Sequence, residues 1–142
     1  MSLADVTKIA RSGLEMQRAR MELVASNLAN AQTTRTPEGG PYRRRVPIVQ
    51  ASHVQGSSFE GQLAQKVRGV EVREVVLDPS PPLMKYEPSH PDANGQGYVA
   101  YPNVDPAQEM VDLVSAVRSY QANINVVRSS GKLNEAALSI SR

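Results

Sequence analysis

The side chains best suited to binding a metal lie together in the middle third of the chain. His90, Asp92 and Asn94 are close in sequence, and Glu87 precedes them. The spacing of these polar groups begins like a calcium-binding loop, but Asn103 stands where that loop needs a bidentate glutamate. Because proline, asparagine and glycine are frequent here, we interpret the segment as a turn and predict no metal site.

Other residue types that carry chemistry lack the necessary context. His53 lies near Ser57 and Ser58, but neither serine sits in the glycine-flanked elbow that presents a nucleophile. Gly95 and Gly97 are followed by neither the further glycine nor the helix of a phosphate-binding loop. Cysteine is absent, which excludes disulfides, thiol catalysis and thiolate metal ligands. We therefore predict that the protein is not an enzyme and has no cofactor.

Arg43, Arg44 and Arg45 form the sharpest basic cluster. A nucleic-acid site would add aromatic residues or a basic helix, and only Tyr42 is near. The 16 Lys and Arg residues against 14 Asp and Glu give a net charge of +2, which is low for a dedicated nucleic-acid binder. We expect an exposed strand or salt bridges to another protein. RNA binding is the alternative, and it predicts strongly salt-dependent retention on RNA.

Length and composition favour a single domain with a modest core. The chain has 142 residues with one Phe, five Tyr and no Trp. No apolar run reaches the roughly 18–20 residues that span a bilayer, so we expect no direct membrane insertion. Asp5, Arg11 and Glu15 interrupt the region where a signal peptide needs an apolar core. If the protein leaves the cytoplasm, we expect no cleaved signal peptide.

A long helix is predicted at the C-terminal end, from Asp105 to Ile140. Asp105 can act as N-cap, Pro106 suits the first helical position, and Gln108 completes a capping box. The helix would have about 36 residues and a length of roughly 54 Å. Apolar or small residues recur at steps of three and four and form one seam: Met110, Leu113, Val117, Tyr120, Ile124, Val127, Gly131 and Leu138.

The same helix carries a second apolar face. Val126, Leu133, Ala137 and Ile140 lie roughly 130° from the seam at about 100° per residue. Burying one Leu, Ile or Val stabilises by about 1.5–3 kcal/mol, so leaving this face in water would forfeit several kcal/mol. Two apolar faces imply neighbours on two sides.

A second long helix is predicted over residues 3–30. Its seam is interrupted by polar Gln17 and consists of Val6, Ile9, Ala10, Gly13, Leu14, Met21, Val24, Leu28 and Ala31. The opposite face has a solvated charge row, Arg11, Glu15, Arg18 and Glu22. Asn27 and Asn30 stand near its end. Asparagine tolerates the left-handed conformation of a helix C-cap, so Asn30 is interpreted as a stop signal.

The middle of the chain is predicted to be β-rich. Strands are expected over residues 42–50, 66–78 and 82–88, with Pro47 confining the first to a sheet edge, and a turn-rich loop precedes residues 98–101. The fold class is α+β: two long terminal helices pair as a coiled-coil-like hairpin around a small β-rich insert. Since the insert has too few apolar residues to cover both helices, we expect copies or relatives of the chain to complete the core.

Both ends carry a recognisable signature. Residues 25–33, with Asn27, Asn30 and Thr33, resemble the N-x-x-N-x-x-T motif of the bacterial flagellar rod and hook proteins. Residues 103–123 resemble the closing helix of the same family, and residues 85–105 are similar to its proximal-rod members. The loop between Thr33 and Tyr42 departs from the family pattern because it is longer than in many relatives.

The resemblance implies a structural subunit of the flagellar basal-body rod, which transmits torque from the rotor to the distal rod and hook. Its partners would be other rod proteins, copies of itself and the type III export apparatus, and the rod would span the periplasm. The chain would divide into an N-terminal rod helix (1–31), a β-rich insert (32–104) and a C-terminal rod helix (105–142). The alternative is a coiled-coil adaptor or secreted protein that binds a single partner.

The two seams define the expected interfaces. We expect the large apolar residues of the N-terminal helix to meet Met110, Leu113, Val117, Tyr120, Ile124 and Val127. Adjacent subunits would contact Val126, Leu133 and Ile140. Asn27 and Asn30 are the polar candidates for capping or for bonds between subunits.

Overall fold

Two long helices at the ends of the chain flank a β-rich middle. The computed structural model describes residues 3–53 and 68–140, apart from the side chains of His53 and Ile140. Ser57 and Ser58 lie outside the described residues, so the structure does not test whether either serine could act as a nucleophile. The elements are α1 (Leu3–Ala29), β1 (Arg45–His53), β2 (Arg68–Leu77), β3 (Leu83–Tyr86), β4 (Tyr98–Tyr101) and α3 (Pro106–Ile140).

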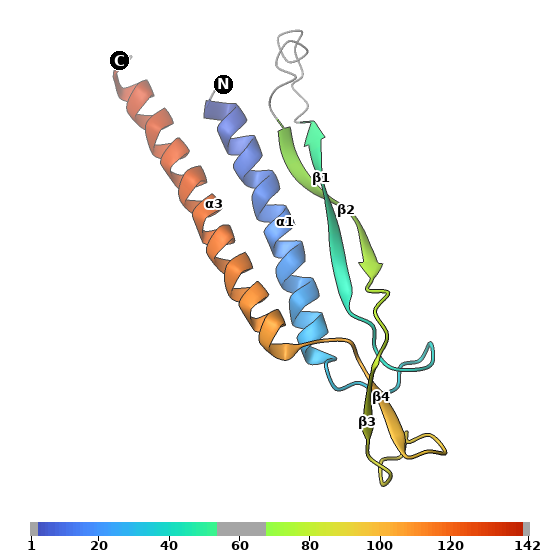
Figure 1. The fold of residues 1–142 in the computed structure, drawn as a ribbon. Helices are drawn as coiled ribbons and strands as arrows, with labels where there is room; N and C mark the ends of the chain where they lie inside the picture. The colour runs from blue at the N-terminus through green and yellow to red at the C-terminus, as the bar shows by residue number, and fades with distance from the viewer. Residues whose placement is uncertain (1–2, 54–67, 141–142) are drawn as a thin grey trace.

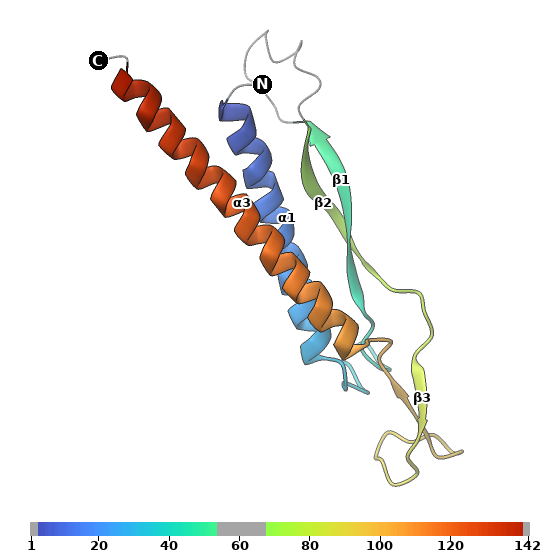
Figure 2. The same cartoon turned by 60° about the vertical axis from the view of Figure 1, so that its left-hand side comes forward.

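The helices run antiparallel and side by side, and both chain ends lie at the same end of the molecule (Figure 1). The β1–β2 hairpin lies along α1, on the side away from α3, while the β3–β4 hairpin projects beyond the far end of the helices (Figure 2). Contacts join α1 to α3, to β1 and to β2. The elongated molecule therefore has α1 as its central layer, and the predicted α+β helical hairpin with a β insert is confirmed.

The ends of the helices follow from their capping residues. Asp105 caps α3, because its Oδ1 accepts a hydrogen bond from the backbone N–H of Ala107 at 2.9 Å. Asn30 ends α1, as predicted, but it does so through side-chain hydrogen bonds and not through a left-handed backbone. Its Nδ2 donates to the carbonyl of Ser26 at 2.9 Å, and its Oδ1 accepts from Thr33 Oγ1 at 3.2 Å. Among the described residues no non-glycine residue has a positive φ, so the left-handed cap is wrong.

Each hairpin forms its own two-stranded antiparallel sheet. β1 pairs with β2 from Arg45↔Leu77 to His53↔Arg68, with a bulge between Ile48 and Val49. β3 pairs with β4 over four residues. In a two-stranded sheet both strands are edges, which is why Pro47 is tolerated in β1.

The first strand begins later than predicted, at Arg45 instead of residue 42. Tyr42 is buried and bonded to Asn27 of α1 through its hydroxyl. The backbone N–H of Arg44 donates to Oδ1 of Asn103 at 3.1 Å. These two contacts hold residues 42–44 against the base of the helices and outside the sheet.

The core is thin. The buried apolar side chains are Ala10, Val24, Tyr42, Val99, Val104 and Ala116. Many larger apolar side chains are exposed on α3 and on all four strands. In the described part of the chain, neither helix has an apolar stretch that could cross a membrane. A large share of the apolar surface therefore lacks intramolecular cover.

Candidate assembly site

With the exception of Val24, the buried positions of α1 and α3 are small or polar residues. The buried positions of α1 are Ala10, Gly13, Gln17, Val24 and Asn27. The buried positions of α3 are Glu109, Ala116 and Ser130, at steps of seven or fourteen residues, with half-buried Asn123 between them. A Cβ atom added at Gly13 would lie 2.7 Å from Nδ2 of Asn123. Small side chains thus let the two helices approach closely.

The predicted seam of α1 is partly right. Ala10, Gly13 and Val24 are buried, and Gln17, which was interpreted as an interruption, is buried too. The larger seam residues Val6, Ile9, Leu14, Met21 and Leu28 are half-buried. The sequence pattern found the correct side of this helix but overestimated how far its large residues are covered.

The predicted seam of α3 needs a correction. Met110 and Leu138 are not covered by α1, because 55% and 69% of their surfaces are exposed, and a Cβ added at Gly131 would meet nothing within 4 Å. The reason lies next to Met110, where Glu109 turns inward to a buried ion pair. One residue corresponds to about 100° of helix rotation. The buried residues of α3 follow a line through Glu109, Ala116 and Ser130. On either side of this line lie the half-buried residues Leu113, Val117, Tyr120, Ile124 and Val127.

Asn27 fixes the base of the helix pair. Its Nδ2 donates to the carbonyl of Arg45 at 2.9 Å and to Oε2 of Glu109 at 3.2 Å. Its Oδ1 accepts from the backbone N–H of Arg45 and from the hydroxyl of Tyr42, both at 2.9 Å. The amide thus uses its whole hydrogen-bonding capacity, and it ties α1 to α3 and to the start of β1.

Arg44 is the second fixed point. Its Nε donates to Oε1 of Glu109 at 2.6 Å, and its guanidinium group lies 3.6 Å from Asp112 and 3.9 Å from Asp78. The Glu109 side chain is only 1% exposed, so this charge depends on its partners. Hydrogen bonds from Ser80, assisted by the positive charge of Arg44, lower the pKa of Asp78 below its usual value. The cluster locks the insert to α3.

Sequence reasoning missed the inward roles of Arg44 and Glu109. Alternation along an extended chain separates Arg44 from its neighbours Arg43 and Arg45, and that signal was available. The structure indeed shows both neighbours exposed and Arg44 half-buried. Glu109 precedes Ala116 by seven residues, which is the spacing of a coiled-coil seam. The predicted seam does not include Glu109, because only apolar or small residues are assigned to it.

The outer side of α3 has an apolar groove near the start of the helix. Met110, Val111 and Val114 are each more than half exposed. Together with Ser115, Arg118 and Ser119 they line a groove of about 470 Å³. The sequence pattern did not predict this surface, because Met110 fits the spacing of the seam expected to face α1.

The C-terminal turns of α3 lack cover from α1. With 35 residues against 27, α3 is longer by eight residues, or about 12 Å at about 1.5 Å per residue. Residues 131–139 are all exposed. Leu133 and Leu138 have 57% and 69% of their surface exposed, and Val126 is exposed as well. The Ile140 side chain lies outside the described residues.

The segment considered for metal binding is a turn. The described residues contain no group of three or more His, Asp or Glu side chains that could hold a metal. Nδ1 of His90 accepts from the backbone N–H of Asp92 at 3.1 Å. Oδ1 of Asn94 accepts from the backbone N–H groups of Gln96 and Tyr98 at 2.9 and 3.0 Å. These side chains therefore hold the loop's own backbone.

Comparison with known proteins agrees with this architecture. Residues 8–35 match the family described as "Flagella basal body rod protein", and residues 96–140 match "Flagellar basal body rod FlgEFG protein C-terminal". These two matches cover most of α1 and α3.

Curated relatives match over nearly the whole chain. The flagellar basal-body rod protein FlgC of Borreliella burgdorferi is 40% identical, over 99% of this chain and 98% of its own length. The FlgC proteins of Bacillus subtilis and Salmonella typhimurium are each 41% identical, over 94% and 91% of this chain and 95% and 90% of their own lengths. The family resemblance seen in the sequence is therefore confirmed, and so is the prediction of a non-enzymatic protein. The chain belongs to the FlgC family of structural flagellar basal-body rod proteins.

Proposed function

We propose that this chain polymerises helically within the basal-body rod through its two terminal helices, and that it transmits torque from the rotor to the distal rod and hook. The observation that carries the proposal is the set of apolar positions on α3 that α1 leaves uncovered. They lie on the outer groove near the start of α3 and on its C-terminal turns.

The division of labour within the helix pair supports assembly. Small and polar residues, together with Asn27 and Glu109, make the intramolecular contact. Apart from buried Val24, the large apolar residues of the two helices are half-buried or exposed. Burying one such side chain stabilises by about 1.5–3 kcal/mol, so covering several of them favours association strongly. This is the pattern expected of a subunit that reserves its large side chains for neighbours.

The position of the uncovered surfaces favours an open polymer over a closed dimer. The groove around Val114 lies near the start of α3, whereas Leu133 and Leu138 lie near its end. Two different surfaces on one subunit allow heterologous, head-to-tail contacts, and such contacts generate helical filaments when the rotation does not close. Torque would pass through the packed helices of successive subunits.

The finer parts of the proposal come from the family resemblance. We infer that copies of this chain and other rod proteins are its neighbours, and that the type III export apparatus delivers it without a cleaved signal peptide. We place the assembled subunit in the periplasm-spanning rod. The division into 1–31, 32–104 and 105–142 belongs to the same proposal, with both helices paired in the tube and the insert facing outward or towards axial neighbours.

The experiment compares Val114→Asp and Leu133→Asp with Asn125→Asp, an exposed polar position on the same helix. Because the changed residues are exposed, the free energy of unfolding of each isolated variant should stay within about 0.5 kcal/mol of the parent. We expect both apolar-to-acid variants to be absent from purified basal bodies and the control to be present.

Normal incorporation of both acidic variants would refute assembly through α3. A soluble one-to-one complex with another protein, without stacking, would favour the adaptor alternative. Circular dichroism of the purified variants separates a folding defect from an assembly defect.

A further inference from the structure

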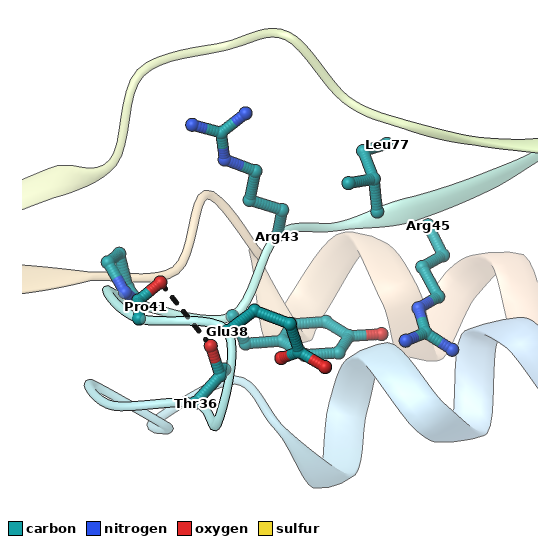
Figure 3. A pocket seen from close by; sticks show the side chains of 8 residues that line it. Thr36, Glu38, Pro41, Arg43, Arg45 and Leu77 are labelled. Atoms are coloured by element: carbon teal, nitrogen blue, oxygen red, sulfur yellow. Dashed lines mark hydrogen bonds between the residues drawn. The ribbon is translucent and has the colours of Figure 1, made fainter.

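A cavity beside the loop that precedes β1 carries positive charge. It has a volume of about 390 Å³, and its lining residues are Thr36, Glu38, Gly39, Pro41, Tyr42, Arg43, Arg45 and Leu77. Figure 3 shows Arg43 and Arg45 at two sides of this pocket, with their guanidinium groups pointing away from each other. Thr36 Oγ1 donates to the carbonyl of Gly39 at 3.5 Å and steadies the loop.

The positive charges of Arg43 and Arg45 are not neutralised by an ion pair within the described residues. Both side chains are exposed, and in the described part of the chain neither forms an ion pair. The Cζ atom of Arg45 lies 5.8 Å from the centre of the Tyr42 ring, a cation–π contact that does not itself occupy the N–H donors of the guanidinium group. Arg43 and Arg45 contribute two positive charges and Glu38 one negative charge, so the lining has a formal net charge of +1. This charge suits a single carboxylate better than a dianionic phosphate.

A smaller cavity adjoins the first, and one of its lining residues, Asn103, has a donor without a partner in the part of the chain that the structure describes. This smaller cavity, of about 110 Å³, shares Arg43 and Tyr42 with the first and adds Ser80, Pro82 and Asn103. The amide of Asn103 is oriented by the backbone N–H of Arg44, which donates to its Oδ1. Its Nδ2 is buried and has no hydrogen-bond partner in the described structure. A buried donor without a partner costs about 1–3 kcal/mol, so an acceptor that reaches it is strongly favoured.

The walls match the stem of an acidic side chain. Pro41, Leu77 and the Tyr42 ring provide apolar surface beside the arginines, and Leu77 has 53% of its surface exposed. Methylene groups of a glutamate could lie on that surface while its carboxylate accepts hydrogen bonds. A free inorganic anion would leave the apolar wall in water.

We propose that this double pocket binds an acidic side chain from a neighbouring rod subunit, with Arg43 and the Asn103 amide as donors to its carboxylate. The inference rests on the proposed assembly, because the acid comes from a neighbour in the rod. It adds a second, electrostatic contact, formed by the insert and distinct from the apolar contacts of α3.

Cross-linking in intact rods identifies the occupant. A photoreactive benzoylphenylalanine is placed at Glu38 of the full chain in motile cells, and the cross-linked peptides of purified basal bodies are sequenced. We expect adducts within a few residues of one Asp or Glu of a neighbouring subunit. Adducts only on segments without acids would overturn the proposal while leaving the rod assembly itself intact.

Charge reversal supplies the energetic test. Arg43→Glu with Arg45→Glu should lower the cross-linking yield and the incorporation into rods about tenfold, the scale of a broken charge-assisted contact. Arg68→Glu with Arg73→Glu makes the same charge change at exposed positions of β2 and should have little effect. Reversing the acid identified on the neighbour should restore the double variant. Equal losses in both double variants would contradict the proposal.

Asn103→Asp tests the orphaned donor with a nearly isosteric change. Oδ1 can still accept from Arg44, but the second carboxylate oxygen would replace the buried Nδ2, so we expect the isolated variant to lose stability, and the cross-linking yield is compared per folded subunit. In the rod, the new carboxylate would repel the incoming acid, so the cross-linking yield should fall. A titration of the parent with inorganic phosphate should show no saturable shift of the Arg43 amide signal. Saturable phosphate binding would instead assign the pocket to free anions.

Discussion

The two ends of α3 differ in which kind of side chain is buried. Near its start, Glu109 is almost fully enclosed and takes part in hydrogen bonds or ion pairs with Asn27 and Arg44. Past Ser130, every described residue is exposed, although Leu133 and Leu138 are among the most apolar of the helix. A charge is thus buried at one end while leucines stay in water at the other.

This contrast separates two tasks. The polar cluster gives the isolated subunit one defined geometry, because each buried polar group accepts only a specific partner. The apolar turns contribute little to the isolated fold, and in the proposed assembly a neighbouring subunit would cover them. Variants at the first end should therefore alter the subunit itself, and variants at the second end should alter only assembly.

The largest expected effect breaks the polar end. Arg44→Ala leaves the Glu109 carboxylate buried without its cation, which typically costs about 3–5 kcal/mol. Urea denaturation of the isolated protein measures this loss. Arg43→Ala, at the exposed neighbouring position, is the matched control and should change stability by no more than about 0.5 kcal/mol. Similar effects of the two changes would remove the distinction between the inward and outward arginines.

A somewhat smaller effect is expected at the close approach of the helices. Gly13→Val should cost about 1–3 kcal/mol, because the added methyl groups displace the Asn123 amide 2.7 Å away. Gly131→Ala, where a Cβ meets nothing within 4 Å, should instead stabilise by about 0.4–1 kcal/mol. The melting temperatures of both variants measure these two changes in stability. A tolerated valine would mean that the helices are not held closely at this point.

The end of α1 should show a modest effect. Asn30→Ala removes the hydrogen bonds to Ser26 and Thr33, and each bond typically contributes about 0.5–1.5 kcal/mol. Gln32→Ala, nearby and exposed, serves as control. Amide hydrogen exchange in the last turn of α1 should rise in the first variant only. If exchange rises equally in both, Asn30 is an ordinary loop residue.

The smallest effect concerns pH. The folded pKa of Asp78 lies below its usual value of 3.8, because Ser80 and Arg44 stabilise the carboxylate. Its contribution to stability is therefore complete above the unfolded pKa and is lost as the pH falls through the lower, folded pKa. Asp78→Asn should flatten the acid limb of the stability curve below about pH 4. An unchanged acid limb would show that Asp78 makes no net contribution.

The sequence predicted the outline of this fold because its signals are local. Asp105 and Pro106 mark the start of α3, and steps of three and four residues give both helices their inward sides. The details depend on contacts across the chain. Arg44 and Glu109 are 65 residues apart, and their pairing sets the rotation of α3 and exposes Met110. Helical periodicity ranks residues by hydrophobicity, so it cannot predict a buried glutamate that owes its place to a distant arginine.

The candidate surfaces were predicted unevenly for the same reason. Leu133 and Val126 lie on a face that the sequence pattern places away from the seam, and the structure leaves both exposed. The Arg43 pocket combines a loop, a strand end and the turn before α3, so no single stretch of sequence carries its signal.

The most direct measurement of the central claim uses the absence of cysteine from the chain. Leu133→Cys and Ser130→Cys each introduce one thiol, the first at an exposed position and the second at a buried one. In the isolated protein, the Leu133→Cys variant should be alkylated rapidly and the Ser130→Cys variant slowly, because exposure governs thiol reactivity. In purified basal bodies, alkylation of Leu133→Cys should slow by about tenfold or more, since a neighbour would then cover the thiol. Equally rapid alkylation in assembled rods would contradict the claim that α3 keeps its apolar turns for other subunits.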